Sequence, residues 1–208
     1  IGMGKSGEAV AKAAADRGAR VTLYEEGSLE TPARLAAQET LQAHGVEVVA
    51  GWHGRLIDPE HDLVVTSPGV RRSHPCLRDS VANGIPVWGE IEFAYRIAPC
   101  PILGITGTNG KSTTTVMTWL ALREQLEDCL LCGNISGSGY PELTLTEAAA
   151  IASTNSVLVA EISSYQLEWV EKFRPRVATI TNVTPDHLDR HPDFEDYQAT
   201  KERLYACM

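Results

Sequence analysis

The sequence lacks long hydrophobic runs and any basic tract, and both absences limit what the chain can bind. No apolar stretch approaches the roughly 20 residues that a membrane-spanning helix needs, so we expect a soluble protein with no membrane partner. The formal net charge of -9 has no compensating basic run, which argues against a nucleic-acid surface. An anionic ligand must therefore be held by local devices such as helix N-termini, backbone N–H groups and a few placed cations.

Cysteine is also scarce, and the five residues in 208 are not spaced like a disulfide framework. In a chain without a signal peptide, scattered cysteines are typical of free thiols in a reducing compartment, so we expect a cytoplasmic protein. Cys129 and Cys132 have the spacing of a redox or metal pair, but they lie in an apolar, strand-like run with no second pair to complete a zinc site. We interpret them as buried structural thiols.

The sequence has no methionine at position 1, and its first residues are those of a turn. Ile1 leads directly into glycines that normally follow a complete β-strand, and residues 197–208 have the pattern of a helix without a stop signal. We therefore expect a fragment of a longer protein, cut at both ends.

Short β-branched runs alternate with helical stretches along the chain. This alternation is typical of the α/β class with a parallel sheet. Thr31 and Pro32 illustrate the helical stretches, because a threonine N-cap followed by proline at the first helical position starts a helix. The predicted strands are Arg20–Tyr24, Val46–Val49, Leu63–Thr66, Ile102–Thr106, Val157–Ala160 and Val177–Ile180.

Pro99 and Pro101 precede a new strand and a second glycine-rich turn. This change of unit predicts a domain boundary between residues 98 and 99, which gives domains of residues 1–98 and 99–208. Each domain has its own strand, glycine loop and helix, so we expect two separate nucleotide-type sites.

The second glycine loop is the strongest motif in the chain. Residues 104–113 read Gly-Ile-Thr-Gly-Thr-Asn-Gly-Lys-Ser-Thr, between an apolar run and a helical stretch. Glycines let backbone N–H groups surround a polyphosphate, Lys111 supplies a point charge, and Ser112 can offer a hydroxyl to Mg²⁺. Strict Walker spacing places glycine at 105, where this chain has Ile, so the loop is a variant; the alternative is an ordinary strand-to-helix turn. The predicted ATP-binding residues are Gly107, Thr108, Asn109, Gly110, Lys111, Ser112 and Thr113.

A phosphate loop needs a carboxylate that faces its metal, and Glu161 is the candidate. It follows the apolar run 157–160, at the strand end where ligands gather in open α/β sheets. On its own, a glutamate after a strand is typical of a solvated loop, but the phosphate loop upstream favours a Mg²⁺ ligand.

A third polar cluster follows the last predicted strand. Residues 184–191 read Thr-Pro-Asp-His-Leu-Asp-Arg-His, so several ionisable groups meet at one strand end. Mg²⁺ prefers oxygen, which favours Asp186 over His187 on chemistry alone. The alternative for each of these residues is a polar loop that contains proline.

Near the start of the chain, Gly2, Gly4 and Gly7 form a G-x-G-x-x-G pattern. Glu25 and Glu26 follow at about the distance of a ribose-binding acid, so spacing alone predicts NAD binding. A single fingerprint also suits other nucleotides, or only the close packing of a helix on a strand.

In order along the chain, four segments resemble the Mur ligase family of amide-bond-forming enzymes. They are residues 104–113, Gly133-Asn134-Ile135, Glu-Ile-Ser-Ser-Tyr-Gln-Leu-Glu at 161–168, and residues 182–190. The phosphate loop is shared with the folylpolyglutamate synthetase relatives, whereas the run at 161–168 is similar to the members that add D-glutamate to UDP-N-acetylmuramoyl-L-alanine. The resemblance covers essentially the whole chain.

This resemblance implies a Rossmann-like domain for the UDP end of the substrate over residues 1–98. A P-loop-type α/β ATPase domain, here incomplete, follows over residues 99–208, and a C-terminal domain that selects the amino acid is missing. The implied activity is ATP-dependent: ATP phosphorylates the substrate carboxylate, and the amine of D-glutamate attacks the acyl phosphate in peptidoglycan precursor synthesis. We expect a monomer with small-molecule substrates, and a fragment that is inactive by itself.

The resemblance also implies roles for single residues around ATP. Lys111 contacts the β- and γ-phosphates, Ser112 and Glu161 hold one Mg²⁺, and His187 approaches a second. Lys201 matches a lysine that family members carbamylate, and a carbamate is an anionic oxygen donor beside a metal. From the sequence alone, Lys201 is a solvated residue on an exposed helix face.

Further residues align with the substrate positions of the family. The family commonly has Thr at position 6 and Asp at 25, so the individual contacts there are open. The residues expected on the substrate side are Ser6, Glu25 and Ser67 in the first domain, and Asn134, Ser163 and Gln166 in the second.

Three alternatives remain beside this ligase. The first is another Mur ligase or folylpolyglutamate synthetase type. The second is a dinucleotide-binding redox or sensor module, which has no use for the Lys111 loop or for Glu161. The third is a nucleotide-binding fragment without turnover.

Overall fold

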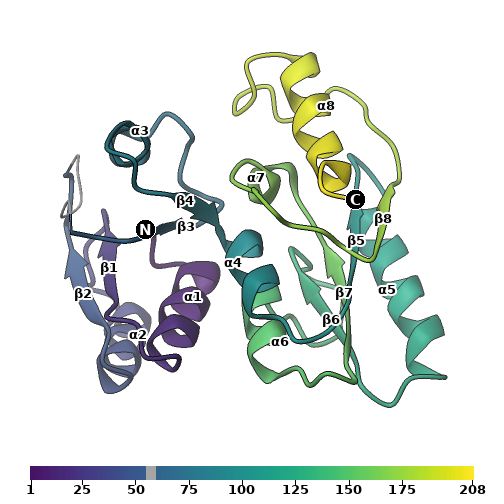
Figure 1. Cartoon of the computed structure of the whole chain (residues 1–208), viewed down its shortest axis with the longest axis horizontal. Helices are drawn as coiled ribbons and strands as arrows, with labels where there is room; N and C mark the ends of the chain where they lie inside the picture. Colours follow the sequence, from purple (N-terminus) through teal and green to yellow (C-terminus); the bar gives the residue numbers. More distant parts are fainter. Residues whose placement is uncertain (55–59) are drawn as a thin grey trace. The chain divides into compact units, whose positions relative to one another are not determined.

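The computed structural model describes residues 1–54 and 60–208 and divides into two compact units, Ile1–Glu90 and Ile91–Met208 (Figure 1). Each unit is built on parallel strands with helices between them. The predicted α/β class is therefore confirmed.

The first unit contains two pairs of parallel strands. β1 (Thr22–Glu25) pairs with β2 (Glu47–Ala50), and β3 (Val64–Thr66) pairs with β4 (Val87–Gly89). The first two residues of the chain lie between the pairs, because Gly2 N donates to Tyr24 O at 2.8 Å and Ser67 N donates to Ile1 O at 3.0 Å. Together they give the order β2, β1, residues 1–2, β3, β4, which is that of a Rossmann-type sheet.

In the described part of this unit, the helices that accompany these strands are α1 (Lys5–Ala15), α2 (Pro32–Ala43) and α3 (Pro75–Ala82). α2 begins as predicted, since the Thr31 hydroxyl accepts a hydrogen bond from Arg34 N at 3.4 Å and Pro32 is the first helical residue. The core between the helices and the strands is formed by Met3, Ala11, Leu23, Leu41 and Val46.

The second unit has a four-stranded parallel sheet in the order β6-β7-β5-β8. The strands are β5 (Ile102–Thr106), β6 (Cys129–Gly133), β7 (Val157–Glu161) and β8 (Val177–Ile180). The helical elements are α4 (Glu90–Ile97), α5 (Lys111–Arg123), α6 (Leu145–Ile151), α7 (Ser164–Leu167), α8 (Phe194–Glu202) and a 3₁₀ turn at Arg203–Tyr205.

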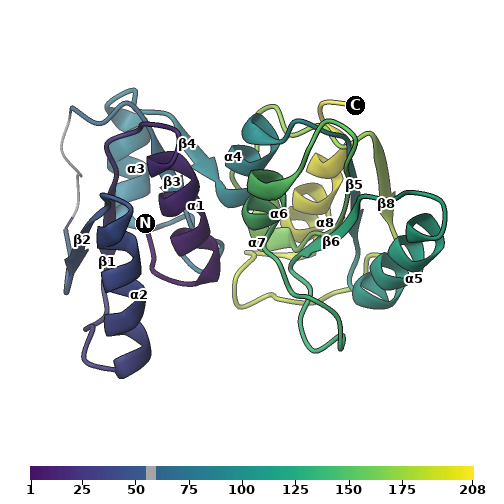
Figure 2. The same ribbon diagram turned by 90° about the horizontal axis from the view of Figure 1, so that it is seen from below.

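Side chains alternate across this sheet and form a core on each face. Ile105, Leu131 and Val159 pack with Trp119 of α5. On the other face, Ile102, Leu158 and Ala160 pack with residues of α4, α6 and the 3₁₀ turn. Figure 2 shows α5 on one side of the strands and α6 on the other.

The predicted strands differ in accuracy. β5 and β8 have the predicted bounds, while β1, β2, β3 and β7 differ by one or two residues at their ends. The strand-like run at Cys129–Cys132 is β6, and β4 was not predicted. The helix predicted over residues 197–208 is wrong in its bounds: Asp193 caps α8 by accepting from Asp196 N at 2.8 Å, and the helix gives way to the 3₁₀ turn after Glu202.

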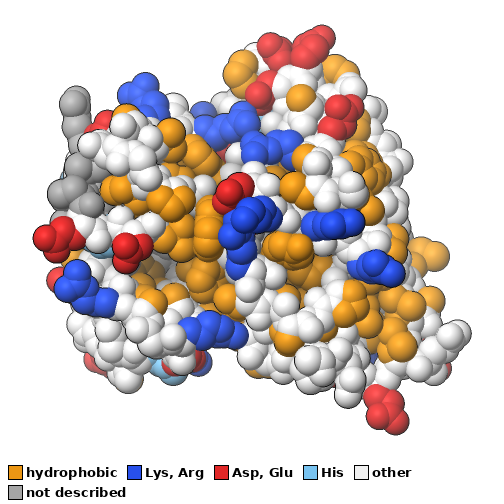
Figure 3. Space-filling model, viewed as in Figure 1, with side chains coloured by type: hydrophobic (Ala, Val, Ile, Leu, Met, Phe, Trp, Pro, Cys, Tyr) orange, Lys and Arg blue, Asp and Glu red, His pale blue; other side chains and the backbone are white. Residues whose placement is uncertain are grey.

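All five cysteines are free thiols, as expected; Cys132 is buried and Cys129 is partly buried. Every helix in the described residues is too short or too polar to cross a bilayer. On the face in Figure 3, lysine and arginine side chains are scattered among acidic and hydrophobic ones rather than gathered into a continuous basic field.

Candidate active site

The loops that follow the four strands of the second unit leave the sheet at one edge. β5 and β7 are neighbours, with Ile105 opposite Glu161 and Ile162 N donating to Ile105 O at 2.8 Å. From β5 the chain passes to β6 and then β7, which both lie on one side of β5. From β7 it crosses to β8, on the other side of β5. Such a change of direction opens a crevice at the carboxyl ends of the strands, where ligands bind in α/β sheets.

The predicted phosphate loop joins β5 to α5 at this edge. Gly107 has φ +150° and a Cβ there would collide with the Thr181 side chain, while Gly110 caps α5 with φ +79°. The glycines are therefore required by the backbone. The N–H groups of the first turn of α5 have no partner within the helix, and the helix dipole makes this end positive. With Ser112 and Thr113 exposed, this N-terminus is suited to an anion.

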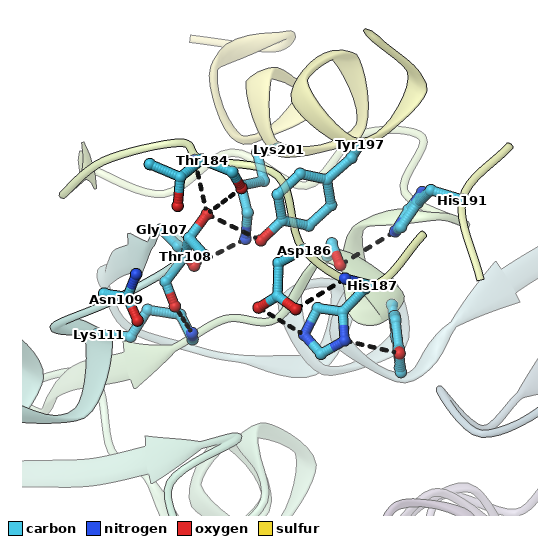
Figure 4. A network of polar contacts seen from close by, with 12 residues as sticks. Gly107, Thr108, Asn109, Lys111, Thr184, Asp186, His187, His191, Tyr197 and Lys201 are labelled. Atoms are coloured by element: carbon cyan, nitrogen blue, oxygen red, sulfur yellow. Dashed lines mark hydrogen bonds and ion pairs between the residues drawn. The ribbon is translucent and has the colours of Figure 1, made fainter. Parts of the chain in front are cut away.

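Residues after β8 hold the phosphate loop in place. Thr108 N donates to Asn182 O at 2.9 Å, and Asn109 N donates to the Asn182 side-chain oxygen at 3.0 Å. The Thr108 hydroxyl lies 3.0 Å from the Tyr197 hydroxyl and accepts from Thr184 N at 3.0 Å (Figure 4). Because these two backbone N–H groups are already used by the protein, the N–H groups available to a phosphate are those at the start of α5.

Two lysines contact the carbonyl oxygens of the loop. Lys111 Nζ donates to Thr108 O at 2.8 Å, and Lys201 Nζ donates to Gly107 O at 2.8 Å (Figure 4). Lys201 is only 1% exposed and lies over the Tyr197 ring at 4.7 Å, so the alternative of a solvated surface lysine is wrong. Burial, and next the nearby Lys111 charge, lower the pKa of Lys201 to about 8, although Asp186 opposes the shift.

Glu161 ends β7 with a carboxylate that is only partly satisfied. The residue is 2% exposed, and its Oε1 accepts from Asn134 Nδ2 at 3.0 Å. Its Oε2 is buried and has no hydrogen-bond partner among the described residues. A buried, unpaired carboxylate oxygen is costly in free energy, and a hard cation such as Mg²⁺ relieves that cost, so the site fits the metal.

The metal candidates do not form a preassembled cage. Among residues 1–54 and 60–208, no three His, Cys, Asp or Glu side chains converge as a metal site. Mg²⁺ commonly keeps waters and phosphate oxygens and uses only one or two protein carboxylates, so a single carboxylate is compatible with it.

His187 lies at the exposed side of this edge. It has φ +53°, a left-handed conformation that side chains rarely adopt, and its ring Nδ1 lies 3.1 Å from the Tyr165 hydroxyl. Its Nε2 lies 3.6 Å from Asp186 Oδ2, and its backbone N donates to Asp186 Oδ1 at 2.8 Å (Figure 4). Asp186 and His187 are thus both brought next to the phosphate loop and Lys201 by the segment after β8.

Ser163 and Gln166 form a capping box at the start of α7. Ser163 Oγ accepts from Gln166 N at 3.3 Å, and Gln166 Oε1 accepts from Ser163 N at 2.9 Å. This local role accounts for both residue types, and the S-x-x-Q signature of such a box is visible in the sequence. Asn134, the third residue expected on this side, is exposed and bonds to Glu161.

The other three predicted substrate residues lie in the first unit. Ser67 Oγ donates to Gly2 O at 3.1 Å, and a Cβ on Gly7 would collide with Gly2 O, so the first glycine loop allows close packing. Ser6 is the second residue of α1 and is partly exposed.

Glu25 is tied to the same loop by its own hydrogen bonds. Oε2 accepts from Met3 N at 2.6 Å, and Oε1 accepts from Gly27 N at 2.8 Å and from Arg34 at 3.2 Å. Burial opposes ionisation of this carboxyl, but these bonds outweigh it and lower the pKa of Glu25. The Glu25 carboxylate therefore holds the first glycine loop in place through hydrogen bonds within the protein.

Sequence reasoning did not single out Tyr165, Tyr197 or Asn182, which support the candidate residues. Tyr197 precedes Lys201 by four positions, so the helix spacing i, i+4 could have placed both on one face of α8. Asn182 and Tyr165 have no such helical spacing to their partners, which lie 73 and 22 residues away in the chain, but both fall in segments that resemble the family.

Comparisons with known proteins agree with this arrangement. The Mur ligase middle domain matches residues 105–208, and the Mur ligase MurD-like N-terminal domain matches residues 1–89. A UDP-N-acetylmuramoylalanine–D-glutamate ligase of Streptococcus pneumoniae (strain JJA) is 42% identical over 100% of this chain and 44% of the relative. That of Streptococcus suis (strain 98HAH33) is 40% identical with the same coverage, so the chain spans less than half the length of these relatives.

Solved structures share the fold. A UDP-N-acetylmuramate:L-alanyl-γ-D-glutamyl-meso-diaminopimelate ligase from Neisseria meningitides superposes with a TM-score of 0.60 at 18% identity, covering 100% of this chain and 67% of that one. A UDP-N-acetylmuramate-alanine ligase from Thermotoga maritima gives a TM-score of 0.54 at 24% identity, covering 99% and 46%. With both domain matches in their expected order along the sequence, the chain belongs to the Mur ligase family.

Proposed function

We propose that the whole protein is an ATP-dependent ligase that joins D-glutamate to UDP-N-acetylmuramoyl-L-alanine in peptidoglycan precursor synthesis. Mur ligases are amide ligases that use ATP and Mg²⁺, and the relatives named above carry this activity in their names. The observation that carries the proposal is the buried Oε2 of Glu161, at the end of the strand beside the phosphate loop, which has no hydrogen-bond partner in the part of the chain that the structure describes.

The phosphate loop binds the polyphosphate of ATP in this proposal. The N-terminus of α5 and Lys111, both within residues 107–113, would meet the β- and γ-phosphates. Ser112 and Glu161 would hold one Mg²⁺, and His187 with Lys201 would serve a second. When bound, Mg²⁺ neutralises the charge on the transferred phosphoryl group.

Carbamylation of Lys201 is part of the proposal, and its environment supports this. A carbamate forms when a neutral amine adds to CO₂ and loses a proton, and burial lowers the pKa of Lys201 to about 8. At neutral pH the neutral fraction is then roughly 10%, against less than about 0.1% for an ordinary lysine. The carbamate would turn a cation beside the loop into an anionic oxygen donor.

The chemistry follows from charge and positioning. ATP transfers its γ-phosphoryl group to the carboxylate of the muramoyl peptide, and ADP leaves. The amine of D-glutamate then attacks the acyl phosphate, the new amide forms, and inorganic phosphate leaves. Lys111 and the α5 N-terminus stabilise the charge that develops on the phosphoryl oxygens.

We further propose residues 1–98 as the domain for the UDP end of the substrate and residues 99–208 as part of the ATP-binding domain. Ser6, Glu25 and Ser67 lie at the first glycine loop, and Asn134, Ser163 and Gln166 lie around Glu161 and α7. Asn134 is the best placed of these, since it is exposed and bonds to Glu161. A cytoplasmic monomer is the expected form.

A dinucleotide-binding redox module is the alternative from another class. It would use Glu25 or Glu26 for a ribose, but it has no use for the Lys111 loop or for the buried Glu161 Oε2, which has no hydrogen-bond partner among the described residues. This arrangement disfavours the redox alternative. NAD binding by the whole protein without any response to UDP-N-acetylmuramoyl-L-alanine would favour it instead.

An amino-acid screen tests the proposal. Phosphate release by the whole protein is measured with ATP, Mg²⁺ and UDP-N-acetylmuramoyl-L-alanine, while the added amino acid is varied. Release that depends on D-glutamate is expected. Release that depends on another amino acid would identify a different Mur ligase, and no release with any of them would overturn the ligase assignment.

A further inference from the structure

The residues that follow His187 are hydrogen-bonded to its carbonyl oxygen, to α7 and to Glu168, the residue after α7. His187 O accepts from Arg190 N and His191 N, both at 3.0 Å. His191 Nε2 lies 3.2 Å from Ser164 Oγ, and Arg190 donates to both oxygens of Glu168 at 2.8 and 2.6 Å. These contacts anchor the segment that follows His187.

The Tyr165 hydroxyl acts on that ring. It lies 3.1 Å from His187 Nδ1, and the two rings meet edge to face with centroids 5.1 Å apart. The Tyr165 ring is itself held by Arg190, whose guanidinium lies 4.7 Å from its centroid. The opposite ring nitrogen, Nε2, faces the Asp186 carboxylate at 3.6 Å.

A hydroxyl is a suitable partner for a histidine that changes tautomer. A neutral imidazole carries one proton, so Nδ1 accepts a hydrogen bond when Nε2 is protonated and donates one when Nε2 is bare. A hydroxyl can rotate to serve either case, whereas a carboxylate or carbonyl can only accept. A histidine that binds a metal usually donates its second N–H to an outer partner, commonly a carboxylate, a backbone carbonyl or water, and this bond fixes the ring orientation.

We propose that Tyr165 is a positioning residue for His187. Its hydroxyl accepts from Nδ1–H when Nε2 presents its lone pair to a divalent cation, and donates to Nδ1 when Nε2–H faces Asp186. This inference rests on the proposed metal role of His187. It adds Tyr165 of α7 to the site. The capping box at the start of α7 accounts locally for Ser163 and Gln166.

Tyr165→Phe tests the inference, because it removes the hydroxyl and keeps the ring. Mn²⁺ binding to the whole protein with a non-hydrolysable ATP analogue is measured by electron paramagnetic resonance. The variant should bind Mn²⁺ about tenfold more weakly, in the range typical of lost outer-shell partners. Tyr205→Phe is the matched control, since it removes a hydroxyl that accepts from Ile180 N at 3.2 Å, and it should bind Mn²⁺ like the wild type.

A second measurement separates positioning from packing. With Mg²⁺ and the analogue, ¹H–¹⁵N NMR of the wild-type His187 ring should show protonated Nδ1, and Tyr165→Phe should show a mixture of tautomers. Weaker Mn²⁺ binding with unchanged tautomers, or unchanged Mn²⁺ binding, would overturn the role of Tyr165. His187→Ala distinguishes a failure of this inference from a failure of the proposed metal role. If His187→Ala weakens Mn²⁺ binding while Tyr165→Phe does not, only this inference fails. If neither variant weakens it, the metal role of His187 fails as well.

Discussion

Lys201 Nζ donates a hydrogen bond to the carbonyl oxygen of Gly107 at 2.8 Å, which joins helix α8 to the phosphate loop. The lysine is buried, and the Tyr197 ring one helical turn earlier lies under its ammonium group. The loop that leaves β5 is thus supported by a helix almost a hundred residues later in the chain. The site therefore forms only when the second unit is folded as a whole.

The buried ammonium predicts a dependence of stability on pH. The pKa of Lys201 is lowered from 10.5 to about 8, so between these values the unfolded chain binds more protons than the folded one. The contribution of this lysine to the free energy of unfolding must therefore rise as the pH increases through this window. In urea unfolding, the free energy of unfolding of the wild type minus that of Lys201→Met should increase from pH 8 to pH 10.5.

Lys172→Met is the control for this titration, because Lys172 is exposed in the same unit. Its difference from the wild type should stay constant over the same pH range. Parallel curves for wild type and Lys201→Met would contradict the lowered pKa.

Glu161→Gln should separate metal binding from folding. The amide keeps the shape of the side chain and removes the buried charge whose Oε2 is unpaired in the described structure. Without Mg²⁺ the variant should unfold at the same or a higher urea concentration than the wild type. Its affinity for Mg²⁺ with a non-hydrolysable ATP analogue should fall at least about tenfold in calorimetry, as for a lost metal contact.

Glu124→Gln is matched to this variant, since it makes the same exchange at the exposed C-terminus of α5. It should leave both measurements unchanged. A Glu161→Gln protein that binds Mg²⁺ and the analogue like the wild type would remove Glu161 from the metal site.

Gly107→Ala should distort the phosphate loop. The added Cβ meets the Thr181 side chain, and the residue has φ +150°. We expect a loss of about 2–3 kcal/mol in the free energy of unfolding, from backbone strain plus a steric collision. Gly139→Ala is the control, because it also has positive φ but open space around its Cβ, and it should cost only about 1 kcal/mol. Equal losses in denaturant unfolding would contradict the collision.

Glu92 is predicted to be a strong determinant of stability outside the site. Its fully buried carboxylate accepts from Glu171 N, Lys172 N and Phe173 N at 2.8, 2.9 and 2.8 Å, and from Arg96 at 2.6 Å. Glu92→Ala should lower the free energy of unfolding by about 3–5 kcal/mol, because the three backbone donors lose their acceptor and Arg96 loses its buried partner.

Glu171→Ala removes only an exposed partner of Arg96 and should cost less than about 0.5 kcal/mol. Similar values for Glu92→Ala and Glu171→Ala in chemical denaturation would show that the buried network contributes little.

The sequence predicts those parts of the site that depend on local signals. The glycine spacing around Lys111 places the loop between β5 and α5, and the apolar run before Glu161 places this carboxylate at the same sheet edge. Both follow from the geometry of a parallel sheet, in which strand ends on one edge gather polar residues.

The burial of Lys201 could not be predicted from local pattern. Lysine is rarely buried, and α8 has a polar sequence with little amphipathic character, so propensity alone favours an exposed helix. The partner, Gly107, is 94 residues away. The hydrogen bond from Asn109 to Asn182 is equally non-local. Ser163 and Gln166 show the opposite case, since their capping box lies within four consecutive residues and can be recognised from the sequence.

Phosphate release by Lys111→Ala is the most direct test of the central claim, that ATP is held by the loop from Gly107 to Thr113. The whole protein is assayed with ATP, Mg²⁺, UDP-N-acetylmuramoyl-L-alanine and D-glutamate, with Lys172→Ala as the control. Lys111→Ala should lose D-glutamate-dependent release by at least about a hundredfold, since a point charge on the transferred phosphoryl group is removed. Release at the wild-type rate would contradict the account.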